Sequence, residues 1–292
     1  MKTTRCVFLA FVLTLVLALL LAASALAVPP LDGSEGAKDP DSPNPLAAKE
    51  LQNRIAPGNV QPGGHGLAAP PRLDHILTIL VEFAGTDTID GTTYTGPLHN
   101  EVPAPAPLDN TTYWIPDFTV DHYQQMLFGT TAGVRSMSTY FSQQSGGTYS
   151  VDGKVYGWVK VPHSEAYYGL NDEARVPELV SEAVQILGDT VPWADYDEND
   201  DGIVDHVQFV HAGIDQSAGG PAWTIWAHSS TVKPAAPTSD PHVVVGPYTI
   251  NPENGAIGVF CHEFAHNLGL PDLYDTIYSL SLIHISEPTR PY

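Results

Sequence analysis

Cysteine is almost missing from this chain, which has two cysteines in 292 residues. Cys6 lies in an N-terminal segment with the features of a cleavable signal, so the mature chain would keep only Cys261 and could form no internal disulfide. Basic residues are also scarce, because 12 Lys and Arg face 33 Asp and Glu, for a formal charge of -21. This charge argues against a nucleic acid partner. It is compatible with solubility outside the cell and with calcium binding.

Long apolar runs are confined to the N-terminus. Lys2 and Arg5 precede an apolar stretch that ends near Leu21, and Ala25 to Ala27 form a small-x-small pattern. We therefore predict a signal peptide over residues 1–27 and a secreted, extracellular protein with no stable membrane association after cleavage. An uncleaved membrane anchor is the alternative, since the run approaches the length of a bilayer span.

The rest of the chain divides by composition. Residues 28–72 are rich in Pro, Gly, Asp and Ala and are predicted to be a propeptide-like disordered segment, although a plain linker has the same composition. Residues 73–278 are predicted to be one α+β domain with a mixed sheet. The expected strands are Ile76–Phe83, Tyr149–Val161 and His206–His211, and the expected helices are Val120–Phe128, Ser136–Ser145 and Val176–Leu187.

Two connections are also predicted from turn-forming residues. A Pro- and Thr-rich loop is expected over Asp90–Pro116. The dipeptide Asp152-Gly153 is expected to form a two-residue hairpin turn within Tyr149–Val161.

Ile76–Phe83 is continuously apolar, which indicates a strand that is buried on both faces.

The segment NPENGAIGVFCHEFAHNLGLPDLYD contains the pattern H-E-x-x-H. On a helix, His262 and His266 lie one above the other, so their imidazoles can bind one ion. Glu263 stands beside the first histidine, where it can reach a water on zinc and act as general base. A core helix with two hydrogen-bonded histidines is the structural alternative.

The residues after this helix suggest the third ligand. Gly269 can adopt a positive φ and end the helix, and Pro271 prevents its continuation. Asp272 then occupies the position of the third metal ligand in the extended zincin motif, and a carboxylate is an acceptable zinc ligand. A turn or capping role for Asp272 is the alternative.

A second candidate metal site is calcium-like. The segment 197–205 reads DENDDGIVD, which matches the first nine positions of an EF-hand-like loop with Gly202 at the bend. The predicted calcium ligands are Asp197, Asn199, Asp201, Asp205 and the backbone carbonyl of Ile203. Position twelve is Gln208, and a strand follows, so the loop is not a true EF-hand. An acidic surface turn is the alternative.

Other chemically active side chains are assigned packing roles. His206, His211 and His228 are expected to be packed or hydrogen-bonded, because lone histidines on strands rarely act as ligands. Cys261 precedes His262 on the helix and faces elsewhere, so we expect it to be buried and inert.

The segment HEFAHNLGLPDLYD resembles the active site of the immune inhibitor A (M6) family of secreted bacterial metalloproteases. TVDHYQQMLF, SMSTYFSQQSGGTYSVDGKV, VPHSEAYYG, DYDENDDGIVDHVQFVHAG and WTIWAHS resemble that family's catalytic domain in the same order. The resemblance implies a zincin, metzincin-like catalytic domain with an active-site helix, removal of a propeptide, and protein substrates. It also favours calcium, since the family commonly has calcium sites.

The chain departs from this family after Asp275, because it ends at Tyr292 and none of its methionines lies there to form a Met-turn. We therefore expect an incomplete C-terminal subdomain. Residues 279–292 resemble translated sequencing-adapter read-through and are expected to be a non-native tail, so His284 and Glu287 receive no role.

Two functions from different classes follow from these features. The first is a secreted zinc endopeptidase that hydrolyses peptide bonds in proteins through a metal-activated water, with Glu263 as general base. The second is a noncatalytic, calcium-stabilised secreted domain. A metal hydrolase of another substrate class is a further alternative among enzymes, because H-E-x-x-H also occurs there.

Overall fold

The computed structural model describes residues 71–109, 112–171 and 173–272. The predicted signal peptide, almost all of the propeptide-like segment and the predicted non-native tail lie outside the described residues and remain predictions. Within the described part, no helix is long and apolar enough to cross a membrane.

The centre of the domain is a five-stranded mixed sheet in the order β4-β1-β5-β7-β6. Its strands are β1 (Arg72–Phe83), β4 (Tyr149–Val161), β5 (Val207–His211), β6 (His228–Pro237) and β7 (Val244–Pro252). β4, β1, β5 and β7 are parallel, and β6 pairs antiparallel to β7 at one edge. This arrangement confirms the predicted mixed sheet.

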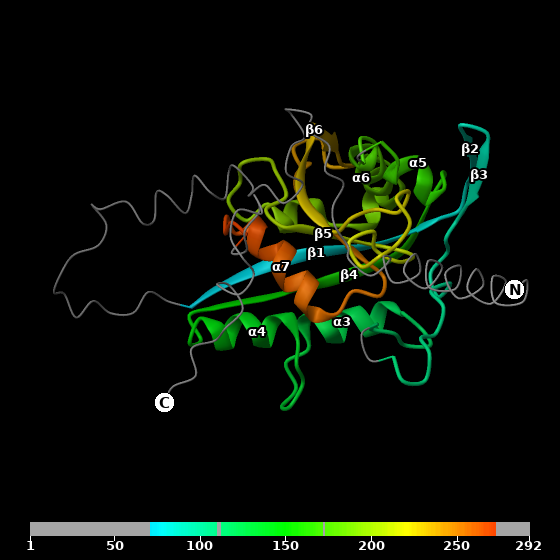
Figure 1. The fold of residues 1–292 in the computed structure, drawn as a ribbon. Helices are drawn as coiled ribbons and strands as arrows, with labels where there is room; N and C mark the ends of the chain where they lie inside the picture. Colours follow the sequence, from blue (N-terminus) through cyan, green and yellow to red (C-terminus); the bar gives the residue numbers. More distant parts are fainter. Residues whose placement is uncertain (1–70, 110–111, 172, 273–292) are drawn as a thin grey trace, which may run out of the picture.

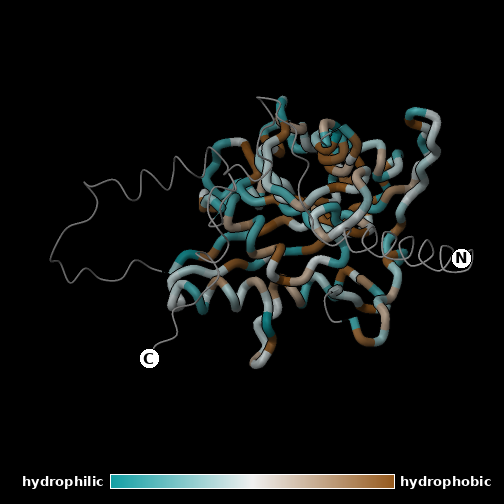
Figure 2. The backbone as a smooth tube through the Cα atoms, in the orientation of Figure 1, coloured by the Kyte–Doolittle hydropathy of each residue, from teal (hydrophilic) through white to brown (hydrophobic). Residues whose placement is uncertain are grey.

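Helices cover both faces of the sheet (Figure 1). They are α3 (Val120–Phe128), α4 (Met137–Gln144), α5 (Glu165–Gly169), α6 (Val176–Leu187) and α7 (Ile257–Asn267), with short 3-10 turns η1 (Gly188–Thr190) and η2 (Trp193–Tyr196). The three long helices predicted before residue 190 are therefore present at the expected positions. Figure 2 shows that apolar residues gather along the central strands and that polar ones are commoner at the periphery.

Strand β1 separates two apolar clusters, because successive side chains point to opposite faces. Leu77 and Ile79 pack into the cluster that includes α6, whereas Ile76 and Leu80 pack with α3, α4 and α7. All four side chains have no exposed surface. The prediction that this strand is buried on both faces is confirmed.

The predicted hairpin turn at Asp152-Gly153 is wrong, because β4 runs straight through both residues. β4 pairs in parallel with β1 along its whole length, and Gly153 stands opposite Ile76. A Cβ at Gly153 would lie 2.1 Å from the Ile76 carbonyl oxygen and 2.8 Å from a ring carbon of Phe128. Glycine is therefore required here for close packing of the sheet and α3, and not for a turn.

The predicted loop over Asp90–Pro116 also needs a correction, because it contains a strand. Strands β2 (Thr86–Ile89) and β3 (Thr92–Thr95) form an antiparallel hairpin. Its turn is Asp90-Gly91, with φ of 50° and 80°. Positive φ at both central residues is what a tight hairpin turn requires. The Thr-rich composition on both sides suits strands as well as loops.

Candidate metal centre

Helix α7 carries the H-E-x-x-H pattern and crosses the face of the sheet on the side of α3 and α4 (Figure 1). Phe260 and Phe264, one helical turn apart, are buried in the cluster on that face. Gly269 follows the helix with a φ of 87°, and the amide of Leu270 donates to the carbonyl of Ala265 at 3.0 Å. This Schellman ending turns the chain back toward the last helical turn.

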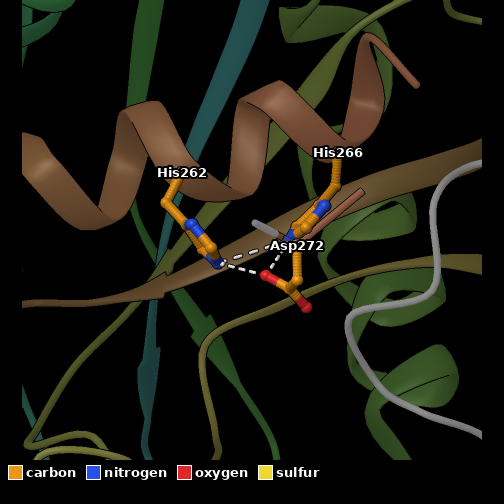
Figure 3. A group of neighbouring side chains, drawn as sticks. All are labelled: His262, His266 and Asp272. Atoms are coloured by element: carbon orange, nitrogen blue, oxygen red, sulfur yellow. Dashed lines mark hydrogen bonds and ion pairs between the residues drawn. The ribbon is translucent and has the colours of Figure 1, made fainter. Parts of the chain in front are cut away.

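The turn brings Asp272 against the two histidines (Figure 3). Asp272 Oδ1 lies 3.3 Å from His262 Nε2 and 3.4 Å from His266 Nε2. The two Nε2 atoms are 3.3 Å apart. Among the described residues, these three form the group of His, Cys, Asp and Glu side chains that could hold a metal ion.

These separations agree with the size of a zinc site. Nitrogen and oxygen ligands at 2.0–2.2 Å from a tetrahedral ion lie about 3.3–3.6 Å from one another. The Asp272 side chain is 4% exposed, and its Oδ1 receives no hydrogen bond from the described residues. A buried carboxylate oxygen that faces two imidazoles is suited to a cation. The residues present therefore fit zinc.

The ring of His266 is held by the backbone. Its Nδ1 lies 2.8 Å from the carbonyl oxygen of Leu270, which is a hydrogen-bond acceptor. Nδ1 therefore carries the proton, and Nε2 presents its lone pair to Asp272 and His262. The H-E-x-x-H pattern does not predict this contact, although a glycine that ends a helix signals that the next carbonyl turns back.

Glu263 and His262 differ in exposure. The side chain of His262 is 41% exposed, whereas that of His266 is 2% exposed. Glu263 is 2% exposed and lies on the buried side of α7, three residues from Phe260. One histidine thus faces solvent, while the carboxylate between the two histidines is largely shielded from it.

The acidic loop at 197–205 is closed by its own hydrogen bonds. The two carboxylate oxygens of Asp197 accept from the amides of Asp201 at 3.0 Å and Gly202 at 2.9 Å. Asp205 accepts from the amide of Glu198 and from the side chain of Asn199, both at 2.7 Å. Gly202 has a φ of 84°, as the predicted tight bend requires. The predicted side-chain ligands therefore line one compact turn.

The three lone histidines are not among the grouped candidate ligands and have carboxylate neighbours. His206 is 3.2 Å from Asp74, His211 is 3.4 Å from Glu165, and His228 is 3.1 Å from Glu173. Burial lowers the pKa of His211 to about 4.

Cys261 is free, and its side chain packs with Phe260 and Phe264 on the buried side of α7. It is 7% exposed, and burial raises the pKa of its thiol to about 12. A thiol that stays protonated is a poor metal ligand.

The chain is similar to known bacterial proteins. The chain is 32% identical over 250 residues to immune inhibitor A of Bacillus thuringiensis subsp. alesti. This match covers 71% of the present chain and 34% of immune inhibitor A. It is also 34% identical over 198 residues to the pre-pro-metalloprotease PrtV of Vibrio cholerae serotype O1 (strain M66-2). This second match covers 54% of the present chain and 22% of PrtV. The matched region is thus about a third or less of each relative.

The family model of the immune inhibitor A peptidase M6 catalytic domain matches residues 68–282. This region contains the whole described domain, from β1 to Asp272. Because the match takes in both the sheet and the metal centre, the chain belongs to the M6 peptidase family of immune inhibitor A.

Proposed function

We propose that this protein is a zinc-dependent endopeptidase that hydrolyses peptide bonds in proteins or peptides. The observation that carries the proposal is the triangle of His262, His266 and Asp272 atoms, 3.3–3.4 Å on a side. Membership of a peptidase family and similarity to a protein called a metalloprotease support it.

The residues would divide the work between binding and proton transfer. His262, His266 and Asp272 would hold zinc, which would supply a Lewis acid for the substrate carbonyl and lower the pKa of water to about 7. Glu263 accepts the proton of the attacking water and returns it to the leaving amine. Its low exposure of 2% favours this role, because a charge shielded from solvent interacts strongly with the reacting groups.

Secretion as a precursor is part of the proposal. The signal-like residues 1–27 and the Pro- and Gly-rich residues 28–72 are its support in the sequence. The name of one relative, a pre-pro-metalloprotease, is compatible with removal of both segments.

Structural calcium is proposed for the acidic loop. The ligands would be Asp197, Asn199, Asp201 and Asp205, with the backbone carbonyl of Ile203. The hydrogen bonds that close the loop support this role, because they hold four oxygen-bearing side chains around one bend. Calcium there would stabilise the connection between η2 and β5.

The test measures zinc and casein cleavage in the wild-type protein, Glu263→Gln and the control Glu101→Gln. Glu101 is an exposed glutamate in the connection between β3 and α3, outside the group of candidate zinc ligands. Glu263→Gln should keep one zinc per chain and lose activity by about 10²–10⁴-fold, the usual contribution of a general base. Glu101→Gln should behave as the wild type.

Two outcomes would reject this function. Casein cleavage that survives Glu263→Gln would come from a contaminant or another site. Wild-type protein that binds zinc and cleaves no protein or peptide would favour the noncatalytic domain instead.

A further inference from the structure

A row of polar side chains crosses the middle of the sheet. In the strand register, Thr78 of β1 stands opposite Gln208 of β5, and Gln208 stands opposite Thr249 of β7. Thr249 in turn stands opposite Ser229 of β6. Four neighbouring strands therefore each contribute one hydroxyl or amide at the same level.

These side chains face the helix that carries the metal centre. Thr78 alternates with Leu77 and Ile79, which belong to the cluster on the α6 side. Thr249 likewise lies between Tyr248 and Ile250 of that same cluster, so its side chain points to the opposite face. That face is crossed by α7, which contacts β7 and β6 (Figure 1). The row thus runs beneath α7.

The row is buried and has no hydrogen-bond partner among the described residues. Thr78, Gln208 and Thr249 are 0% exposed, and Ser229 is 2% exposed. Within the described part of the chain, no hydrogen bond reaches the three hydroxyl groups or either side-chain atom of the Gln208 amide. Buried polar groups without partners are strongly unfavourable, so most of them in native proteins are satisfied by protein or by internal water.

The spacing of the row suits water. Neighbouring strands are about 4.7–4.9 Å apart. Short hydroxyl side chains on neighbouring strands can bond directly, as Thr86 and Thr95 do at 2.9 Å, yet no such bond joins the members of the row among the described residues. Two polar atoms that share one water at about 2.8 Å with a tetrahedral angle lie about 4.6 Å apart. One water between each pair of strands would therefore satisfy both neighbours.

The chemistry of the row also selects the ligand. Its members are hydroxyl and amide groups, which are neutral and can both donate and accept. A divalent metal site in a protein normally includes at least one carboxylate, imidazole or thiolate, and the row contains none of these. A neutral ligand that donates and accepts at the same time, such as water, matches this set.

We propose that Thr78, Gln208, Thr249 and Ser229 form a site for internal water molecules that link four strands beneath α7. Asn251 extends the site, because it is two residues from Thr249 on the same strand face, is 0% exposed and has no partner for its amide in the described chain. This hydration site is independent of the proposed proteolysis. Part of the sheet surface on which α7 rests is therefore polar.

The first test compares the thermal unfolding of the wild type with Thr78→Val and Thr249→Val. Valine has nearly the shape of threonine and lacks the hydroxyl, so each variant should fold. If water is bound, each substitution removes a water-mediated bond from its neighbours and should lower Tm by about 2–4 °C. If the hydroxyls are buried without water, valine removes an unfavourable group and Tm should rise. Such a rise would overturn the proposal.

Two further measurements make the test specific. Thr92→Val, in the exposed part of β3, is the matched control and should leave Tm nearly unchanged. Because Thr78 and Thr249 both neighbour Gln208, the double variant should lose less than the sum of the two single losses. Additive losses would contradict a shared water network.

Direct detection completes the test. NMR cross-peaks between long-lived water and the Gln208 side-chain amide should be present in the wild type and weakened in Thr249→Val. Their absence in the wild type would overturn the proposal, whatever the effects on Tm.

Discussion

The metal centre on α7 and the acidic loop at 197–205 hold their oxygen and nitrogen atoms in different ways. At the metal centre, Asp272 Oδ1 receives no hydrogen bond from the described residues and faces two imidazoles. In the acidic loop, both oxygens of Asp197 already accept backbone amides. At the metal centre, a cation is needed to balance the buried carboxylate oxygen of Asp272. In the acidic loop, backbone amides already hold the carboxylate of Asp197 in place. We therefore expect the loss of zinc to abolish function and the loss of calcium to lower stability.

Removal of a zinc ligand should have the largest effect. His262→Ala should weaken zinc binding by more than about 100-fold, since even the loss of an outer partner of a ligand typically costs 10–100-fold. His262 is a better choice than His266, because its side chain is 41% exposed and its loss should leave the fold intact. Zinc affinity is measured by competition with a chelator, with far-UV circular dichroism as the check on folding.

The matched control for that substitution is His242→Ala. His242 is exposed in the loop before β7. It should bind zinc as the wild type does. Equal zinc affinity in His262→Ala and His242→Ala would remove His262 from the ligand set.

Asp272→Asn separates the ligand role of Asp272 from a turn role. Asparagine keeps the ability to form turns and caps, but its neutral amide is a weaker ligand than a carboxylate. Zinc affinity should therefore fall by about 10–100-fold while Tm without zinc stays nearly the same. A fall in Tm with unchanged zinc affinity would mean that Asp272 is structural.

Calcium should raise stability without changing zinc content. For the metal-free protein, calcium at 100 times its Kd should stabilise the fold by about 2.7 kcal/mol, or roughly 5–10 °C in Tm. Asp201→Ala should abolish this increase and keep zinc binding. Differential scanning calorimetry with and without calcium checks both. A calcium response that persists in Asp201→Ala would place the ion elsewhere.

The smallest expected effect is a pH dependence of the calcium-free loop. Burial raises the pKa of Asp205, and the nearby carboxylates of Asp201 and Glu198 also raise it. A raised pKa favours the folded state at low pH, and this contribution is lost as pH rises through the pKa of the folded form. Without calcium, the wild type should therefore lose stability relative to Asp205→Asn as pH rises from about 4 to about 6.

Calcium should reverse this trend, because it binds the ionised carboxylate. The measurement is the difference in Tm between the wild type and Asp205→Asn at both pH values, with and without calcium. A difference that grows in favour of the calcium-free wild type as pH rises would contradict the raised pKa.

Local sequence rules identified α7 and its termination well. Phe260 and Phe264 recur at helical spacing, and Gly269 ends the helix with a positive φ, as predicted. The dipeptide Asp-Gly shows the limit of such rules. At Asp90-Gly91 it forms a tight hairpin turn, whereas at Asp152-Gly153 it lies inside a long strand. The two dipeptides have the same local preference, and pairing of β4 with β1 decides the second case.

By itself, the sequence determined the positions of the main helices, the two histidines on one side of α7 and the candidate ligands of the acidic loop. These features depend on residues close together in the chain, where spacing and turn chemistry are sufficient. Tertiary structure alone decided that Gly153 packs against Ile76 and that Thr78, Gln208, Thr249 and Ser229 align beneath α7. The reason is that strand register depends on contacts between segments that are distant in the chain.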